Sequence, residues 1–172
     1  PIIRYGVCVL MIYLGFGSNL GDRISNIHKA YEYLSYFGEI VERSPVYESR
    51  AMLYPGDKEE QGDYLNSVVS FETDLSPHAL LHEIKSVEAK IGIRNKKKWS
   101  ARYLDIDILL YHDVILSCDN LILPHPEITK RAFVLKPLSD IAADIIIPGQ
   151  EKSVRLFLIN SDTASLSVYS AG

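Results

Sequence analysis

The order in which periodic segments follow one another constrains the fold of this chain more than any other feature. Apolar residues recur at helical spacing in 24–34 and 80–91, and Asp22 and Ser76 are placed to cap these two helices. The segments with strand character are 12–16, 39–48, 64–73 and 103–111. Together, these segments give the order β-α-β-β-α-β.

That order is typical of the ferredoxin-like split βαβ motif, in which helices pack on an antiparallel sheet. We therefore expect an α+β fold with a ferredoxin-like β-α-β-β-α-β core and C-terminal additions. The additions are expected to be a strand at 114–117 paired with the last core strand, a helix near 127–130 and a strand at 145–147. One domain is expected over 1–172, with 1–10 as a non-native or additional N-terminal segment.

Composition and charge exclude several classes of partner. Hydrophobic residues make up 47% of the chain, which is enough to bury a core. The net charge is −4, whereas a nucleic-acid-binding protein is usually basic, so we expect no nucleic-acid partner. No apolar run approaches the ~18 residues of a membrane span, so no membrane association is expected. Cys8 and Cys118 lack metal-ligand spacing, and a reducing cytoplasm is the expected compartment.

Two glycines follow the first apolar strand. Gly15-x-Gly17 resembles the start of a dinucleotide-binding motif, but Leu20 stands where the third glycine belongs, and no acidic residue about 20 positions on completes a βαβ unit. We therefore reject that interpretation and expect a tight turn at Gly17-Ser18-Asn19.

The clearest strand carries two acidic side chains on one face. Because side chains alternate along a strand, Asp105 and Asp107 share a face, with their Cα atoms roughly 6.5–7 Å apart. The other face is predicted to be core and consists of Leu104, Ile106, Ile108 and Leu110. A hard divalent cation relieves the repulsion between two such carboxylates, and oxygen-only ligands favour Mg²⁺. A plainer interpretation is that both aspartates face water, and so short a motif alone favours it.

Positive charge lies directly before the two aspartates. A cationic loop beside carboxylates can hold a polyphosphate between them, with Mg²⁺ as the bridge. Arg102 can offer a bidentate fork to phosphate, although a single lysine of the loop is more often simply solvated. Trp99 either stacks on a flat heterocycle or pins the loop to the core. His125, between two prolines, is either a phosphate donor or a surface turn residue. The basic residues are Arg94, Lys96, Lys97, Lys98 and Arg102.

Taken together, the motifs resemble the 6-hydroxymethyl-7,8-dihydropterin pyrophosphokinase family of folate synthesis, over about 12–148. No single motif is decisive, but the ordered set with matching gaps is highly specific. The motifs are Gly17-Ser18-Asn19-Leu20-Gly21-Asp22, Asp63-Tyr64-Leu65-Asn66, Phe71-Glu72-Thr73, Trp99 with Arg102 and Leu104-Asp105-Ile106-Asp107-Ile108-Leu109, Pro124-His125-Pro126, and Arg131-Ala132-Phe133-Val134-Leu135.

The resemblance implies transfer of the β,γ-diphosphate of ATP to the hydroxymethyl oxygen of the pterin, with release of AMP. It implies ATP as co-substrate and two Mg²⁺ ions held by Asp105 and Asp107. The implied catalytic residues are Arg102, Asp105, Asp107 and His125. The implied ATP-binding residues are Glu88, Arg94, Lys96, Trp99, Arg102, Leu123, His125 and Arg131. The implied pterin-binding residues are Ser49, Arg50, Met52, Tyr64, Asn66, Trp99 and Phe133. In this set, Tyr64 and Phe133 sandwich the pterin ring, and Asn66 bonds to its edge.

The basic loop departs from the pattern of that family. Ile93 and Asn95 stand where arginines are common, so Arg94 or Lys96 is expected to cover the missing charge. This departure motivates an alternative, a non-catalytic ATP- or pterin-binding relative that acts as a structural partner of a folate enzyme. A Mg²⁺-dependent nucleotidyltransferase or nuclease is a second alternative, which the acidic net charge disfavours. The resemblance also implies fusion to, or association with, another folate-pathway enzyme.

Overall fold

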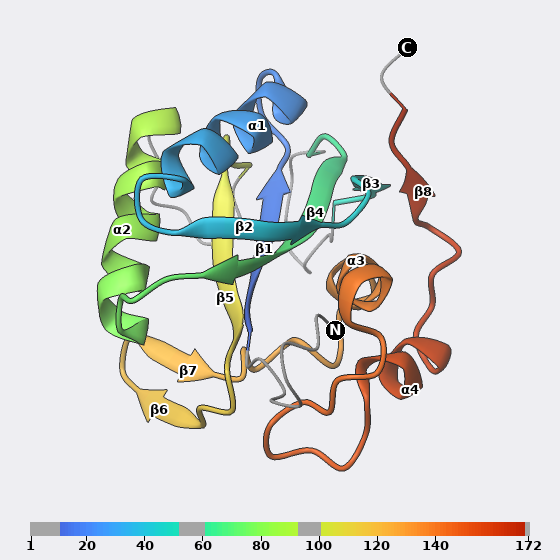
Figure 1. Ribbon diagram of the computed structural model, residues 1–172. Helices are drawn as coiled ribbons and strands as arrows, with labels where there is room; N and C mark the ends of the chain where they lie inside the picture. Colours follow the sequence, from blue (N-terminus) through green and yellow to red (C-terminus); the bar gives the residue numbers. More distant parts are fainter. Residues whose placement is uncertain (1–10, 52–60, 93–100, 171–172) are drawn as a thin grey trace.

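The computed structural model describes residues 11–51, 61–92 and 101–170, and the fold is given for these residues. Within them, an antiparallel sheet has the order β5-β1-β4-β3-β8, and β2 pairs with the other half of β4 (Figure 1). The strands of the sheet are β1 (Ile12–Ser18), β2 (Glu39–Arg43), β3 (Tyr47–Ser49), β4 (Tyr64–Glu72), β5 (Asp105–Tyr111) and β8 (Ser167–Val168). The predicted antiparallel α+β core is confirmed.

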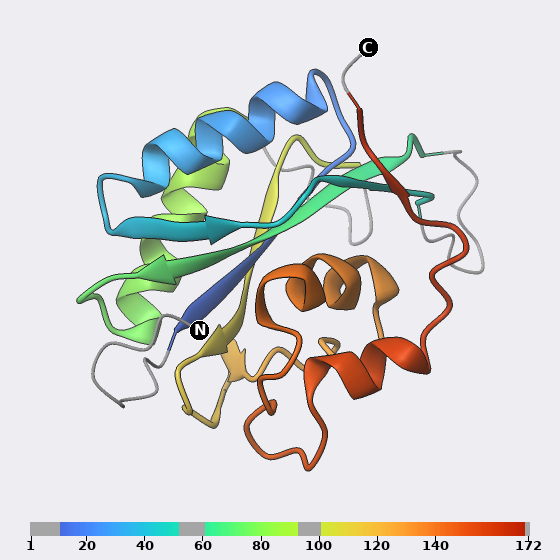
Figure 2. The same ribbon diagram turned by 45° about the vertical axis from the view of Figure 1, so that its right-hand side comes forward.

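Helices cover both faces of this sheet, as the turned view shows (Figure 2). On one face lie α1 (Arg23–Leu34) and α2 (Pro77–Ile91), the two helices of the predicted core. On the other face lie α3 (Ala132–Ala142) and α4 (Val154–Ile159). A separate hairpin is formed by β6 (Leu116–Cys118) and β7 (Leu121–Leu123). Among the described residues, no helix has both the length and the apolar character that a membrane span requires.

The predicted helix caps are present. The Asp22 carboxylate accepts a hydrogen bond from the Ser25 amide at 3.1 Å and so caps α1. The Ser76 hydroxyl accepts one from the Ala79 amide at 3.4 Å, and Pro77 follows as the first residue of α2. These local signals therefore place the starts of both core helices correctly.

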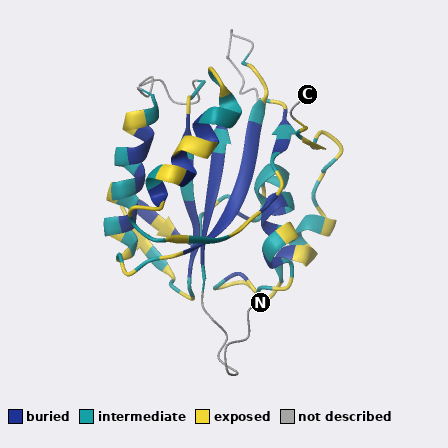
Figure 3. Ribbon diagram, turned by 45° about the horizontal axis from the view of Figure 1, so that its top comes forward, coloured by how far each residue is buried: buried dark blue, intermediate teal, exposed yellow. Residues whose placement is uncertain are grey.

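The sheet separates two hydrophobic cores. Ile12 and Leu14 of β1 point into the first core, toward α1 and α2. The second core lies on the opposite face, where Tyr13 packs with Leu135 and Leu138 of α3. Figure 3 shows the central strands as buried, with exposed residues along the outer sides of the helices. Burial of a leucine side chain contributes about 1.5–3 kcal/mol, so Leu135 and Leu138 hold α3 firmly on the sheet.

A β-bulge in β5 changes which face its side chains reach. Leu14 pairs with Ile108 while Tyr13 pairs with Leu110, so Leu109 is an extra residue in β5. The alternation shifts by one position there, and Leu110 joins the second core. The prediction that Leu110 shares a face with Ile108 is therefore wrong, because the bulge depends on pairing with β1.

Several other predicted elements differ in the structure. The single strand expected at 39–48 is divided into β2 and β3, where Ser44 leaves the ladder and its hydroxyl accepts from the Val68 amide. The strand expected to pair at 114–117 pairs with β7 instead of β5. Residues 127–130 form turns, and the helix starts at Ala132 and continues through the buried Pro137.

The last part of the chain also differs from expectation. The strand expected at 145–147 is reduced to an isolated bridge between Ile146 and Ser153. The helix α4 and the strand β8 were not expected, because both are short and owe their conformation to contacts with α3 and β3.

Candidate active site

The floor of the site is a stretch of β1 that presents only glycines to this face of the sheet. Gly15 and Gly17 face the same side of the sheet, since they are two positions apart in the strand. In the register of the sheet, Gly15 lies opposite Asp107, and Gly17 lies opposite Asp105 on one side and Asn66 on the other. The turn expected at Gly17 is therefore wrong, because β1 continues to Ser18. Gly17 leaves open space between Asp105 and Asn66, whereas the Leu109 side chain packs against Gly15, 3.2 Å from where a Cβ would lie.

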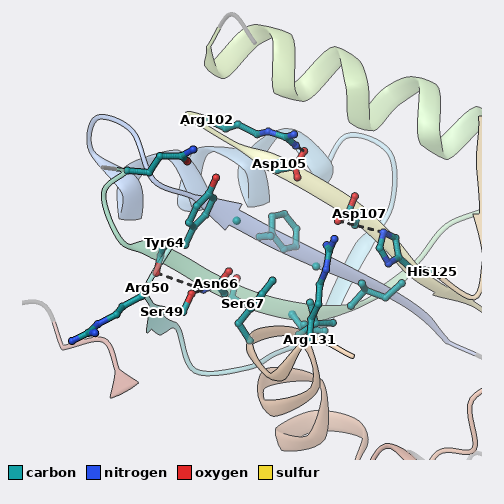
Figure 4. Close-up of a pocket in the computed structure, with 18 residues that line it drawn as sticks. Ser49, Arg50, Tyr64, Asn66, Ser67, Arg102, Asp105, Asp107, His125 and Arg131 are labelled. Carbon is teal, nitrogen blue, oxygen red and sulfur yellow. Dashed lines mark hydrogen bonds and ion pairs between the residues drawn. The ribbon is translucent and has the colours of Figure 1, made fainter. Parts of the chain in front are cut away.

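This open space is a cavity of about 280 Å³ between the sheet and the start of α3 (Figure 4). The cavity lies on the face of the sheet that carries the second core, and it extends past the residues of that core. Ten of the sequence-predicted site residues line it: Ser49, Arg50, Tyr64, Asn66, Arg102, Asp105, Asp107, His125, Arg131 and Phe133. The fold therefore brings these ten residues, from distant parts of the sequence, to one cavity.

The remaining sequence-predicted site residues lie elsewhere. Leu123 is 1% exposed and belongs to the first core. Glu88 is also buried and does not line the cavity, and its carboxylate accepts a hydrogen bond from the Ile106 amide at 2.8 Å. Its predicted role in nucleotide binding stays a prediction. The positions outside the described residues are Met52, Arg94, Lys96 and Trp99.

Arg102 and Asp105 form an ion pair at one end of the cavity. The Arg102 Nη1 lies 2.5 Å from the Asp105 Oδ1, and Figure 4 shows the two side chains pointing toward each other. Burial is the largest single effect on the Arg102 guanidinium and lowers its pKa. The charge and hydrogen bond of Asp105, together with Tyr64 and Asp107, outweigh burial, and the net pKa is raised. Arg102 therefore stays fully charged, which suits its guanidinium to bind an anion.

Asp107 and His125 form the second charged pair. The His125 Nε2 lies 3.8 Å from the Asp107 Oδ2. His125 is held at its backbone, where its amide donates to the Leu109 carbonyl at the bulge of β5 at 2.9 Å. Its Nδ1 accepts from the Glu127 amide at 3.2 Å, so the proton of the neutral ring is on Nε2 and points into the cavity.

The cavity shifts the pKa values of both members of this pair. Burial raises the pKa of Asp107, and the neighbouring Asp105 raises it further, against the opposing effects of His125 and Arg131. Burial lowers the pKa of His125, although Asp107 opposes that shift. Figure 4 shows Arg131 reaching from the start of α3 toward the aspartates. The site thus concentrates both negative and positive charge in a small volume.

The other end of the cavity suits a flat polar ring. The Asn66 Nδ2 donates to the Ser49 hydroxyl at 2.9 Å, which fixes the amide plane of a side chain that is 4% exposed. The Asn66 Oδ1 lies toward the floor, 3.9 Å from where a Cβ of Gly17 would be. Tyr64 lines this cavity from the sheet, and Phe133 lines it from the first turn of α3. An aromatic pair and a fixed amide are groups that bind a polar heterocycle.

Sequence reasoning missed some residues of the cavity. Gln61 and Val134 line it. Val134 belongs to the motif that starts at Arg131, and Gln61 lies two residues before the motif that starts at Asp63, but neither carried a signal of its own. Gly15 and Gly17 were interpreted as part of a turn. Their spacing of two inside an apolar strand is a signal of a bare strip on one face, and it was available in the sequence.

The two aspartates are suitable ligands for Mg²⁺. They offer only carboxylate oxygens, and they lie on one face of β5. In the part of the chain that the structure describes, no group of three or more His, Cys, Asp or Glu side chains could hold a metal ion. A magnesium ion here would therefore take its other ligands from water and phosphate, which is its usual coordination in nucleotide-using enzymes.

Comparison with known proteins gives consistent matches. The family model for 7,8-dihydro-6-hydroxymethylpterin-pyrophosphokinase (HPPK) matches residues 13–143. A 2-amino-4-hydroxy-6-hydroxymethyldihydropteridine pyrophosphokinase of Aquifex aeolicus is 45% identical over 146 residues, 85% of this chain and 89% of that protein. A protein of the same name from Methylorubrum extorquens is 37% identical over 156 residues, 90% of this chain and 95% of that protein.

The solved structures show the same fold. A crystal structure of HPPK-DHPS in complex with substrates superposes with a TM-score of 0.67 at 15% identity. The match covers 88% of this chain but only 43% of the other. This likeness shows the fold alone, and the chain spans less than half of that protein.

Proposed function

Because the chain belongs to the 7,8-dihydro-6-hydroxymethylpterin-pyrophosphokinase family, we propose how its own residues perform the pyrophosphokinase reaction. The reaction transfers the β,γ-diphosphate of ATP to the hydroxymethyl oxygen of 6-hydroxymethyl-7,8-dihydropterin and releases AMP. The single observation that supports our assignment of residues is the cavity, which has ring-binding groups at one end and charged groups at the other.

The pterin binds at the end of the cavity lined by Tyr64, Asn66 and Phe133. The two aromatic side chains contact the faces of the ring, and the Asn66 amide bonds to its polar edge. Ser49 keeps this amide oriented, because it accepts one of the amide protons at 2.9 Å. The hydroxymethyl group then points along the glycine floor toward the aspartates.

The diphosphate binds at the other end. The oxygens of the diphosphate accept hydrogen bonds from Arg102, from Arg131 and from the Nε2–H of His125. The two guanidinium groups balance most of its negative charge. Asp105 and Asp107 would hold Mg²⁺, which would neutralise the charge of the phosphates and help to orient them. Transfer of a phosphoryl group depends mainly on such positioning and charge stabilisation, so no covalent intermediate with the protein is needed.

The non-catalytic alternative has less support. The identity of 45% to a curated pyrophosphokinase and the complete set of described cavity residues both favour an active enzyme. The HPPK-DHPS structure supports a related proposal, that a domain of this kind works beside a second folate enzyme.

An assay for AMP tests this function. The full chain is incubated with ATP, MgCl₂ and 6-hydroxymethyl-7,8-dihydropterin, and AMP and the pterin diphosphate are measured by chromatography. We expect both products in equal amounts and none after addition of EDTA. Tight binding of both substrates without AMP would contradict the catalytic proposal and favour the binding alternative.

A further inference from the structure

Asn19 lies where β1 ends and bonds to two segments on different sides of the cavity. Its Oδ1 accepts a hydrogen bond from the Arg102 amide at 2.6 Å. Its Nδ2 donates to the Gly62 carbonyl at 3.3 Å and to the Gln61 Oε1 at 3.4 Å. The side chain is buried, at 6% exposure, and its amide oxygen and both amide protons are engaged with these two segments.

The backbone around Asn19 strengthens the link to Arg102. The amides of Asn19 and Leu20 both donate to the Arg102 carbonyl, at 3.0 and 3.1 Å. Together with the Oδ1 contact, three hydrogen bonds fix the peptide groups on both sides of the Arg102 Cα. The guanidinium therefore starts from a fixed point when it reaches the Asp105 carboxylate.

Other groups already anchor the next residue. The Tyr103 carbonyl accepts from the Ser18 hydroxyl at 2.5 Å and from the Asn26 Nδ2 at 3.0 Å. This part of the chain is thus attached to the end of β1 without the Asn19 side chain. What the Asn19 side chain adds is the connection between Arg102 and the segment 61–62.

That connection joins the two ends of the proposed active site. Gln61 lines the cavity, and Tyr64, which is proposed to contact the pterin, follows Gly62 by two residues. Arg102 serves the diphosphate end. Because one short side chain bonds to both segments, their separation is fixed to within the tolerance of a hydrogen bond.

We propose that Asn19 is a positioning residue that aligns the phosphate-binding Arg102 with the pterin-binding segment 61–64. This inference rests on the proposed function. Phosphoryl transfer is sensitive to such alignment, and a misplacement of about 1 Å can cost about 100-fold in rate. Asn19 therefore acts on the transfer step when both substrates are bound, more than on the affinity for either substrate alone.

Two variants separate the contacts of Asn19. Asn19→Ala removes both side-chain contacts but keeps the backbone amide that donates to Arg102. Asn19→Asp has the same shape and keeps the acceptor for the Arg102 amide, but it replaces the donor to Gly62 with an oxygen. If Asn19→Ala does not fold, Asn19→Asp alone carries the test.

Thr73→Val is the matched control for stability. The Thr73 hydroxyl also joins two segments, since it donates to the Phe37 carbonyl at 2.5 Å and accepts from the Leu75 amide at 3.2 Å, at the far end of β4. It does not line the cavity. Its loss destabilises the fold without a route to the alignment of the substrates.

For each variant, Tm, the Kd of each substrate alone, KM and kcat are measured. We expect kcat of both Asn19 variants to fall by about 10–100-fold, with each single-substrate Kd within about 3-fold of wild type. Thr73→Val should keep its kcat despite a lower Tm. A fall in kcat at Asn19 no greater than in Thr73→Val at equal loss of Tm overturns the inference. If the wild type forms no AMP, the proposed function fails instead, so the two failures are distinguishable.

Discussion

At Gly17, a missing side chain determines what the neighbouring groups can bind. A Cβ there would lie 3.6 Å from the Tyr64 ring and 3.9 Å from the Asn66 Oδ1, which are ordinary contact distances. The fold can therefore accept an alanine, whereas a ring lying on the floor cannot. This distinction between space that the fold needs and space that a substrate needs makes Gly17 a test of the pterin end.

We expect Gly17→Ala to weaken pterin binding by about 10-fold or more, because the methyl group occupies part of the floor on which the ring is proposed to lie. The Kd of the pterin measured by calorimetry checks this, and the Kd of ATP with Mg²⁺ in the same variant is the control. Weakening of both to the same degree would contradict the assignment of this end to the pterin.

Asp107 tests the diphosphate end. Asp107→Asn keeps the shape but removes the charge that the proposed Mg²⁺ ions need, so we expect kcat to fall at least about 100-fold. Asp113→Asn, an exposed aspartate just beyond β5, is the control and should keep its activity. Retention of activity in Asp107→Asn would remove the proposed metal ligand.

Glu88 gives a pH-dependent prediction at the same scale. Burial raises its pKa, although Lys85 and the Ile106 amide oppose the shift, so ionisation costs more in the folded than in the unfolded protein. The wild type therefore loses stability as pH rises from the ordinary carboxyl pKa to the raised one. Glu88→Gln lacks this loss and keeps an acceptor for the Ile106 amide.

We accordingly expect the Tm of Glu88→Gln, relative to wild type, to be higher at pH 7 than at pH 4. Glu88→Ala leaves the Ile106 amide unpaired and should lower the free energy of unfolding by about 1–3 kcal/mol at both pH values. Thermal melts at the two pH values check both statements. A relative Tm of Glu88→Gln that falls between pH 4 and 7 would contradict the raised pKa.

At the scale of elements, α3 is attached to β3 as well as to the core. The Tyr47 hydroxyl donates to the Asp140 Oδ2 at 2.6 Å, and Lys136 pairs with the Asp140 Oδ1. Phe133 lies at the start of α3, so the contact between Tyr47 and Asp140 helps to position the side of the cavity where Phe133 is proposed to contact the pterin.

We expect Tyr47→Phe to lower the free energy of unfolding by about 1 kcal/mol and to weaken pterin binding a few-fold, because α3 loses one of its attachments to the sheet. Urea unfolding and the Kd of the pterin provide the measurements. Tyr36→Phe, at a tyrosine that is 79% exposed, is the control and should change neither quantity. An unchanged pterin Kd in Tyr47→Phe would show that the contact between Tyr47 and Asp140 does not position Phe133.

The elements also show what the sequence could predict. The caps of α1 and α2 were predictable because the groups involved lie within three residues of each other. The bulge at Leu109 and the start of α3 at Ala132 were not, because both depend on pairing and packing between distant segments. Most of the cavity residues were recognised from motifs, whereas the bare strip at Gly15 and Gly17 required the strand to be recognised as continuous.

At the scale of the whole molecule, the site occupies the part of a sheet face that the second core leaves open. The helices α1 and α2 cover one face along its length, while α3 and α4 cover only part of the other (Figure 2). Residues 144–170, beyond the match to the family model, include α4 and return to the sheet as β8, where the Tyr169 amide donates to the Val46 carbonyl at 2.8 Å. The site is therefore lined by the sheet on one side and by the start of α3 on the other.

Leu109 makes the register between β5 and β1 as important to the site as the composition of β5. With this extra residue, the carboxylates of Asp105 and Asp107 and the apolar side chain of Leu110 all reach the same face of the sheet. If β5 kept its length but paired with β1 without the bulge, strict alternation would send one of these sets to the wrong face, either the acids into the first core or Leu110 out of the second. A change that abolishes the bulge would therefore damage the site without altering either aspartate.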